Sequence, residues 1–329
     1  MNKSKVRGHI AMLFTALIFG VNIPLSKNLM PDWISPIGLT YSRFAFGAIA
    51  FWIISLFIKS EKVTRKDMGT LFLGSLLGVG INQGSFIAGL QRTSVTNASI
   101  VITVTPILAM IISFFILREP ITFKKAGGVF IGLIGVLSMI LTSQGVHSGQ
   151  QASITGDLLC VLSSLSYAFF LVLTRGISKR YNSLTLMKWM FLFSAILFMP
   201  FGYRDLSSAA IFTHGSPVAW GSYLYMLIGA TLITYLLIPV AQREIRPTTI
   251  GMYNYLQPLV AAFIAIMWGH DAFSWTKPLS GILIFIGVYL VTTSKSKADA
   301  DHEKEIRRQE EDLPQLQPLL VTEPVKKFL

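Results

Sequence analysis

The sequence predicts an all-α membrane protein with ten transmembrane helices, arranged as two inverted five-helix repeats with both termini in the cytoplasm. Three observations predict this fold: ten long apolar segments, an excess of Lys and Arg in alternate loops, and a similarity between the two halves of the chain. Of the 329 residues, 52% are hydrophobic and 13% are charged, whereas soluble domains carry about 25% charged residues. A chain this apolar could not cover its surface for water, so a soluble two-domain enzyme is excluded.

The ten apolar segments have the length of membrane spans. A span needs about 20 mostly apolar residues, because the hydrocarbon core is about 30 Å thick and a helix rises about 1.5 Å per residue. The segments are residues 9–29, 34–58, 69–90, 95–117, 125–143, 155–175, 183–203, 217–241, 248–269 and 275–294. The first is longer than the core of a signal peptide, and no small-residue cleavage site follows it. Nor do the segments alternate as the strands of a β-barrel do.

The loop charges predict the orientation. With the N-terminus inside, the cytoplasmic loops before the tail carry fifteen Lys and Arg and the outer loops carry four. The loop at 144–154 has no Lys or Arg. Because cytoplasmic loops carry the excess of positive charge, both termini are predicted to be cytoplasmic. Residues 295–329 have mixed charge and little apolar content, so we expect a disordered cytoplasmic tail.

The two halves of the chain match when one is shifted along the other. A shift of 152 residues aligns Thr96 with Thr248, Pro106 with Pro258, Glu119 with Asp271 and Gly135 with Gly287. In the first span a shift of 148 aligns Gly8 with Gly156 and Lys27 with Arg175. Apolar matches are common between membrane spans, whereas shared Pro, Gly and acidic positions are not. Each unit has five spans, and because five is odd the second unit enters the membrane from the opposite side.

Inverted repeats predict a secondary transporter. Such carriers bind substrate near the membrane midplane between the two halves and expose it to each side in turn. A passive channel or facilitator for small solutes is the alternative. The HExxH and GxSxG patterns are absent, so nothing in the sequence supports a membrane-embedded enzyme. The P-loop pattern is absent as well, so nothing supports an ATP-driven pump. The one cysteine and five scattered histidines exclude a disulfide framework and predict neither a metal site nor a cofactor.

Several segments resemble a known transporter family. They are GHIAMLFTALIFGVNIPLSK (8–27), SPIGLTYSRFAFGAIA (35–50), residues 86–139 with the spacing of Pro106, Glu119 and Gly135, and residues 247–290. In these segments the chain resembles the EamA-type exporters of the drug/metabolite transporter superfamily. Asp271 replaces the usual Glu in the second half, and Ala272 stands where Pro120 does.

The resemblance implies residues 1–143 and 155–294 as EamA-like repeats joined by an outer linker at 144–154. It implies export or exchange of small metabolites, including amino acids or related amphipathic compounds, through a central cavity. The expected location is the bacterial cytoplasmic (inner) membrane. The expected partners are a small-molecule substrate and membrane lipids but no nucleic acid, with the chain a monomer or homodimer.

Two charged side chains inside spans are the first candidates for substrate binding. Arg43 is nine residues into the second span, and Lys188 is five residues into the seventh. A charge at the bilayer centre costs about 3 kcal/mol or more, so such residues are functional candidates. We expect them to recognise a substrate carboxylate or phosphate, with snorkelling to the interface as the alternative. For Lys27, at the end of the first span, snorkelling is favoured. Glu119 and Asp271 follow spans and precede Lys-bearing turns, so they are predicted to form ion pairs or helix caps.

Uncharged polar and aromatic side chains at middle depth complete the predicted site. They are Asn22, Asn82, Gln83, Ser99, Thr103, Tyr167, Trp189, Tyr235, Tyr253, Asn254 and Gln257. A buried amide needs hydrogen-bond partners, and a polar cavity supplies them, while aromatic rings offer a surface for an apolar group. By contrast, Gly74, Gly78 and Ser163 are predicted to serve helix packing. Pro106 and Pro258 are each predicted to free a carbonyl one turn earlier.

Overall fold

The computed structural model describes residues 3–58, 61–93, 98, 101–142, 153–267 and 275–295. Within these ranges the chain is built from helices and their connections, without a β-strand. The predicted tail after Lys295, nearly all of the predicted linker at 144–154, and the residues Ser99 and Asp271 lie outside the described part.

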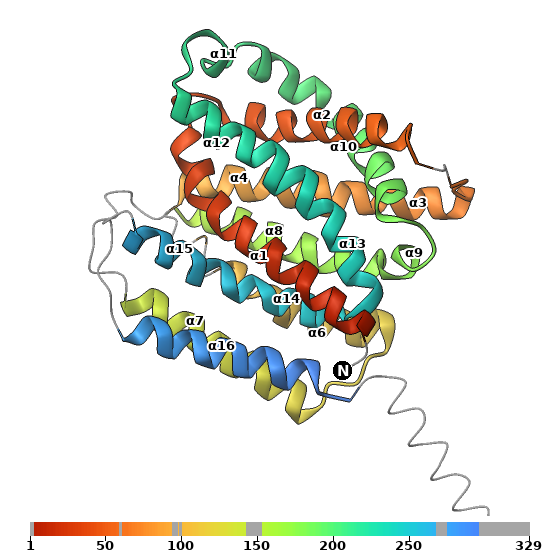
Figure 1. The fold of residues 1–329 in the computed structure, drawn as a ribbon, viewed down its shortest axis with the longest axis vertical. Helices are drawn as coiled ribbons and strands as arrows, with labels where there is room; N and C mark the ends of the chain where they lie inside the picture. The colour runs from red at the N-terminus through yellow and green to blue at the C-terminus, as the bar shows by residue number, and fades with distance from the viewer. Residues whose placement is uncertain are drawn as a thin grey trace, which may run out of the picture.

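The helices follow one another through short connections (Figure 1). The first half contains α1 (Lys3–Leu29), α2 (Pro36–Ser55), α3 (Arg65–Gly74), the π-helix η1 (Ser75–Ile81), α4 (Asn82–Arg92), α6 (Thr105–Leu117) and α7 (Phe123–Thr142). The second half contains α8 (Ile154–Leu173), α9 (Arg175–Ser178), α10 (Ser183–Ser207), α11 (Ile211–His214), α12 (Pro217–Leu227), the π-helix η2 (Ile228–Ile233), α13 (Thr234–Glu244), α14 (Pro247–Met252), the 3-10 helix η3 (Tyr253–Tyr255), α15 (Leu256–Met267) and α16 (Thr276–Thr292).

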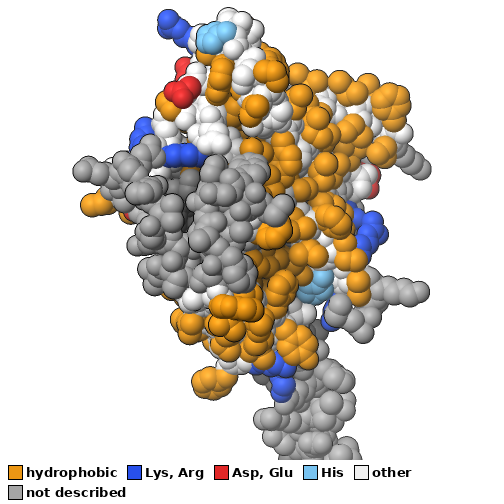
Figure 2. Space-filling model, turned by 60° about the vertical axis from the view of Figure 1, so that its left-hand side comes forward, with side chains coloured by type: hydrophobic (Ala, Val, Ile, Leu, Met, Phe, Trp, Pro, Cys, Tyr) orange, Lys and Arg blue, Asp and Glu red, His pale blue; other side chains and the backbone are white. Residues whose placement is uncertain are grey.

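Six helical stretches of the described chain are long and apolar enough to cross a membrane. They are Ser4–Leu29, Pro36–Ser55, Arg65–Arg92, Ile154–Leu173, Ser183–His214 and Pro217–Glu244. Thr105–Leu117 and Pro278–Thr292 are shorter apolar helices. Large apolar side chains such as Leu56 and Phe57 are exposed on the outside of the bundle. Figure 2 shows them as a broad hydrophobic surface with Lys and Arg at its margins, the distribution that a lipid-facing surface requires.

Corresponding helices of the two halves begin on corresponding caps. Thr64 caps α3 and Ser216 caps α12, and these residues are 152 positions apart. Ser35 caps α2 and Asn182 caps α10, with each side chain accepting from the backbone N–H three residues later. An oxygen at this position satisfies a backbone donor that has no partner within the helix.

Two of the long stretches are interrupted by π-helices at the same register. η1 interrupts the stretch from Arg65 to Arg92, and η2 interrupts the stretch from Pro217 to Glu244. The shift of 152 residues places Gly78 of η1 on Ala230 of η2. A π-turn changes the hydrogen-bonding pattern of the backbone and is frequent at functional sites.

The two prolines singled out in the sequence lie at helix starts. Pro106 occupies the first turn of α6, after a turn at residues 103–104. Pro258 occupies the first turn of α15, directly after η3. Proline fits the first turn because the N–H that it lacks would have no partner there. Both prolines therefore follow a break in the regular helix.

The helices of the two halves interleave. α2 packs on α10 and α7 packs on α16, while α1 packs on α13 and α15, and α8 packs on α4 and α6 (Figure 1). The sequence shifts map α1 onto α8, α13 onto α4 and α15 onto α6, so these contacts are exchanged between the halves. The contact between α2 and α10 is close, because a Cβ atom on Gly202 would lie 2.2 Å from the Cβ of Tyr41.

Candidate functional site

A cavity lies between the two halves, among α1, α2, α4, α6, α8, η3, α13 and α15. Eight of the predicted site residues line it: Asn22, Arg43, Asn82, Gln83, Tyr167, Tyr235, Asn254 and Gln257. Its volume is about 80 Å³, below the range of roughly 300–1,000 Å³ that is typical of small-molecule sites. A metabolite therefore fits only if the surrounding helices move apart.

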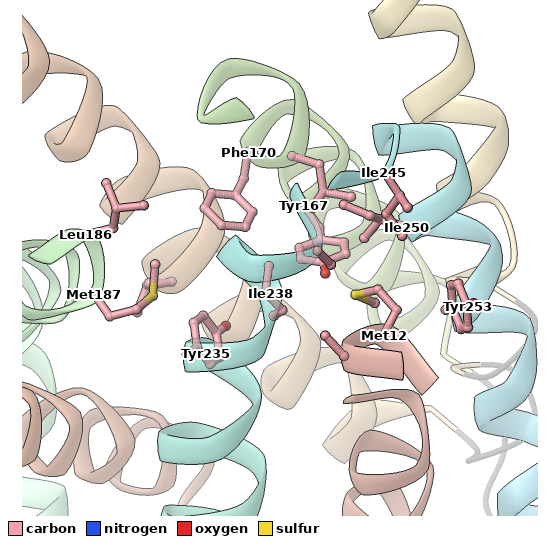
Figure 3. Packing of buried hydrophobic residues seen from close by; sticks show 14 of the residues in the cluster. Met12, Tyr167, Phe170, Leu186, Met187, Tyr235, Ile238, Ile245, Ile250 and Tyr253 are labelled. Carbon is pink, nitrogen blue, oxygen red and sulfur yellow. The ribbon is translucent and has the colours of Figure 1, made fainter. Parts of the chain in front are cut away.

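Four other predicted residues do not line this cavity. They are Thr103, Lys188, Trp189 and Tyr253. The Nζ atom of Lys188 lies 5.0 Å from the centroid of the Trp52 ring, and Trp189 packs edge-on against the same ring. Tyr253 is hydrogen-bonded through its hydroxyl to Nδ1 of His9 at 2.8 Å, and Figure 3 shows it across the hydrophobic cluster from Tyr235. The predicted anion-binding pair of Arg43 and Lys188 is not assembled here.

Part of the lining was not predicted from the sequence. Thr105, Ser163 and Ser164 contribute hydroxyl groups, and Phe19, Ile23, Phe86 and Ile102 contribute apolar surface. Ser163, predicted to serve packing, both lines the cavity and exchanges hydrogen bonds with Asn82: its hydroxyl donates to the Asn82 carbonyl at 2.8 Å, and Nδ2 of Asn82 donates to that hydroxyl at 3.0 Å.

The internal similarity carried a signal for the missed residues. The shift of 152 residues pairs Gln83 with Tyr235, Ile102 with Asn254 and Thr105 with Gln257, and the shift of 148 pairs Phe19 with Tyr167. Each of these eight residues lines the cavity. These four pairs show that part of the lining is repeated between the two halves.

Arg43 is the charged residue of this lining, and it is 3% exposed. Its Nε donates to Oγ1 of Thr231 at 2.8 Å, and its Nη2 donates to the carbonyl of Ala230 at 2.7 Å. Both partners belong to η2, so Arg43 of the first half is held by the π-helix of the second. These contacts use two of the five guanidinium N–H donors, which leaves donors for a carboxylate or carbonyl oxygen in the cavity.

The cavity also contains buried acceptors. Nε2 of Gln83 donates to the Tyr235 hydroxyl at 2.7 Å, and that hydroxyl donates to the Gly78 carbonyl at 3.1 Å. Because the hydroxyl proton is directed to Gly78, the Gln83 amide must present its nitrogen to Tyr235. Its Oε1, like Oδ1 of Asn22, has no hydrogen-bond partner in the described part of the chain. An unpartnered buried acceptor costs about 1–3 kcal/mol, so both oxygens suit an N–H donor from a ligand.

Polar and aromatic groups complete the lining. Nε2 of Gln257 donates to Oδ1 of Asn254 at 3.1 Å. The Tyr167 ring stacks on Phe170 with ring centroids 5.8 Å apart, and Figure 3 shows both rings in the hydrophobic cluster beside Tyr235. In the described residues no group of three or more His, Cys, Asp or Glu side chains is arranged to hold a metal ion.

Glu119, in the connection between α6 and α7, forms the ion pairs expected of it. The buried carboxylate accepts from Nζ of Lys125 at 3.0 Å and from Nη1 of Arg175, which belongs to the second half. Burial alone would raise the pKa of Glu119, but the charges and hydrogen bonds of Lys125 and Arg175 outweigh it and hold that pKa below its usual value. Glu119 therefore stays ionised and ties the two halves together at this end.

Lys27 has specific partners at the end of its span. Its Nζ donates to the carbonyls of Leu90, Gln91 and Thr93 at 2.5, 3.2 and 3.0 Å. The last carbonyls of a helix lack intrahelical partners and carry partial negative charge, so an ammonium group is favourable there. Lys27 fixes the end of α1 to the end of α4.

The comparisons with known proteins agree with this architecture. The EamA-like transporter family matches residues 6–141 and 154–293. The chain belongs to this family. Among its relatives, the uncharacterized transporter YetK of Bacillus subtilis is 22% identical over 302 residues, covering 91% of this chain and 90% of YetK. An S-adenosylmethionine/S-adenosylhomocysteine transporter of Chlamydia muridarum is 26% identical over 286 residues, covering 84% and 87%.

The family extends to plants and to solved structures. A WAT1-related protein of Arabidopsis thaliana is 25% identical over 349 residues, covering 92% of this chain and 91% of the relative. A solved crystal structure superposes with a TM-score of 0.68 at 16% identity, covering 88% of this chain and 96% of the other, which shows a shared fold. Family membership and the apolar helices identify the chain as an integral multi-pass protein of the inner membrane, in a family of transporters.

Proposed function

We propose that the chain is a secondary transporter that exports or exchanges small metabolites bearing an amino-acid-like group, by alternating access through the central cavity. The observation that carries this proposal is the placement of Arg43 together with two unpartnered acceptors, on Asn22 and Gln83, around one cavity between the two halves.

The chemistry of the lining favours a zwitterion. The guanidinium of Arg43 offers charge-assisted hydrogen bonds to a carboxylate, and the oxygens of Asn22 and Gln83 accept from an ammonium group. The rings of Phe19 and Tyr167 provide surface for an apolar or aromatic side chain. The Chlamydia relative is named for two compounds that each carry an α-amino carboxylate group, which is in keeping with this class of substrate.

The proposed architecture is ten spans in two inverted repeats, residues 1–143 and 155–294, with both termini in the cytoplasm. The corresponding caps, the matched π-helices and the exchanged helix contacts support the repeat. Alternating access then requires the helices around the cavity to separate on one side at a time. The pair of Glu119 and Arg175 joins the halves at the end that we assign to the cytoplasm.

Counterflow in vesicles containing the purified protein tests this function. Vesicles are loaded with each amino acid of a panel in turn, and entry of the same labelled compound is followed. We expect saturable, trans-stimulated exchange of zwitterionic substrates, with the decarboxylated amine and the deaminated acid of a good substrate competing at least about tenfold more weakly, the difference expected for one lost charged contact. Flux that does not saturate and is not trans-stimulated would instead indicate a channel.

Cysteine labelling tests the proposed topology. The one native cysteine, Cys160, is buried, and Cys160→Ala provides the background. Single cysteines placed within 144–154 should react with an impermeant reagent in intact cells, whereas those within 59–67 should react only after the membrane is opened. Labelling of both sets from outside would contradict the inverted repeat.

A further inference from the structure

Lys188 and Trp52 form a pair of hydrogen-bond donors that the proposed transport site does not use. Lys188, on α10, is 6% exposed, and its ammonium lies 5.0 Å from the centroid of the Trp52 ring on α2. The indole Nε1 of Trp52 is buried and has no hydrogen-bond partner in the described part of the chain. Neither a hydrogen bond nor an ion pair joins Lys188 to another described residue.

Two acidic side chains close in sequence to the ends of α2 and α3, Glu61 and Asp67, have partners of their own. Glu61 accepts from the backbone N–H of Asn182 at 2.8 Å. Asp67 accepts from Arg180 at 2.6 Å and from the Tyr181 hydroxyl at 2.8 Å. Two neighbouring donors without an acceptor, one of them charged, suit an anionic oxygen ligand, because the Trp52 ring attracts the ammonium but offers it no acceptor oxygen.

The surroundings of the pair are those of a lipid-facing site near a membrane boundary. Trp52 lies three residues before the end of α2 and Lys188 lies five residues after the start of α10, which is about 5 and 8 Å along the helix axes. The rings of Trp52, Trp189, Phe193 and Phe72 contact one another in sequence. Phe72 is 40% exposed, and Ile53 on α2 and Leu56 and Phe57 directly after it are exposed as well.

We propose that Nζ of Lys188 and Nε1 of Trp52 bind the phosphate of an anionic phospholipid in the adjacent leaflet. The exposed apolar side chains take the acyl chains, and Lys188 reaches the headgroup along its own apolar stem. By the loop charges this is the cytoplasmic leaflet, whose anionic lipids attract basic residues. The lipid fixes the contact between α2 and α10 from outside the transport cavity.

Native mass spectrometry of the purified full chain tests this site. The protein is titrated with phosphatidylglycerol or with phosphatidylcholine of the same acyl chains. We expect half-saturation by phosphatidylglycerol at a concentration about tenfold lower, the size of one charge-assisted contact. Lys188→Gln should remove that preference, and Lys188→Arg should keep it. Trp52→Phe keeps the ring but loses the N–H, and should weaken the preference by a few fold. Lys179→Gln removes an exposed charge four residues from α10 and should change nothing.

Three results would overturn the proposal. They are equal binding of the two lipids by the unaltered protein, an unchanged preference in Lys188→Gln, and complete displacement of phosphatidylglycerol by millimolar inorganic phosphate, which would identify a soluble anion as the ligand. If Lys188→Gln does not fold, the decision rests on Lys188→Arg and Trp52→Phe, because the first keeps the charge and the second keeps an aromatic ring. Equal preference in Trp52→Phe and the unaltered protein would then reject the two-donor site.

Discussion

The two π-helices occupy corresponding positions in the two halves, yet their backbone carbonyls are satisfied by different donors. In η1 the carbonyl of Gly78 accepts from the neutral hydroxyl of Tyr235. In η2 the carbonyl of Ala230 accepts from the cationic guanidinium of Arg43. Each donor comes from the opposite half of the chain. The π-helix is therefore repeated in both halves, whereas the positively charged donor is found at only one of them.

Because of this difference, the two halves contribute unequal charge to the cavity. Arg43 is the eighth residue after the cap of α2, and the eighth residue after the cap of α10 is Met190. Arg43 therefore gives the cavity lining a cation from the first half, whereas Met190 of the second half is buried in the hydrophobic core and does not line the cavity. Substitutions can test this difference between the halves, first at the ion pairs that join them and then at the residues around each π-helix.

The largest effect is expected where the halves are tied by charge. Glu119→Gln leaves the fully buried Lys125 without its carboxylate, and removing one partner of a buried pair costs about 3–5 kcal/mol. The free energy of unfolding should fall by that amount, measured by denaturant titration in mixed micelles at pH 7. Asp205→Asn, at the other end of the bundle, removes a carboxylate that accepts a hydrogen bond from the Ser35 hydroxyl, and serves as the milder control. An equal loss of unfolding free energy in Glu119→Gln and Asp205→Asn would contradict the special role of the Glu119 ion pairs.

The same variant has a defined pH dependence. The pKa of Glu119 is held below its usual value in the folded protein, so its stabilising contribution is present above the unfolded pKa of about 4.3. That contribution is lost as the pH falls below this value and through the folded pKa. The stability difference between the unaltered protein and Glu119→Gln should thus be constant near neutral pH and shrink on acidification. A difference that grows on acidification would contradict the ion-pair assignment.

Arg43 comes next, because it carries the asymmetry of the cavity. Arg43→Gln should weaken the apparent affinity for a carboxylate substrate by about 10- to 100-fold, since a hydrogen bond to a charged group contributes about 1.5–3 kcal/mol. Arg43→Lys keeps the charge but loses the planar guanidinium, so its apparent affinity should fall between those of the unaltered protein and Arg43→Gln. Counterflow affinity and membrane abundance are measured on the same cells. Near-normal affinity in Arg43→Gln would remove Arg43 from the substrate site.

Gly78 tests whether the two π-helices tolerate the same side chain. Alanine already stands at the corresponding position, Ala230, but a Cβ on Gly78 would lie 2.4 Å from the ring of Phe170. Gly78→Ala should therefore lower the free energy of unfolding by about 2 kcal/mol through overpacking. Gly229→Ala is the control, because its nearest neighbour would be 3.4 Å away. A stable Gly78→Ala variant would show that η1 and η2 are equally spacious.

The smallest effect is expected for the neutral donor. Tyr235→Phe leaves the Gly78 carbonyl and Nε2 of Gln83 without their hydroxyl partner, and should cost about 1 kcal/mol of stability. Adding Gln83→Leu removes one of the stranded groups, so the double variant should lose less than the sum of the two single variants. Strict additivity of the thermal shifts would show that the two side chains are not coupled.

The sequence predicted which amide side chains lie in the middle of the bundle, but it did not predict which charged side chains reach the cavity. Mid-span amides such as Asn22, Gln83 and Asn254 were predicted to line a cavity, because a buried amide needs polar surroundings, and they do. Lys188 contacts Trp52, which lies nine residues beyond Arg43 along α2. Nine residues span about 13 Å of helix, so Lys188 lies nearer the end of the bundle than Arg43 and does not reach the cavity.

Other features had no local signal in the sequence. A π-turn depends on how neighbouring helices pack, and the residue types at Gly78 and Ala230 do not predict one. The partners of Lys27 had no signal in the sequence, because the end of α4, which attracts its ammonium group, is more than sixty residues away in the chain. Ser163 was assigned to packing because small residues commonly serve it, yet its hydroxyl is part of the polar lining.

The hydrogen bond between Gln83 and Tyr235 joins two positions that are 152 residues apart, the same interval that relates the halves. Under the proposed duplication these residues descend from one ancestral position, which in a dimer of separate chains would have faced its own copy across the two-fold axis. Gln and Tyr can each donate and accept, so either residue is able to pair with itself there. Two copies of Arg43, by contrast, would have placed two like charges around one cavity. Under the same duplication, fusion into a single gene would have freed the copies to diverge and let one half acquire a cation that the other half lacks.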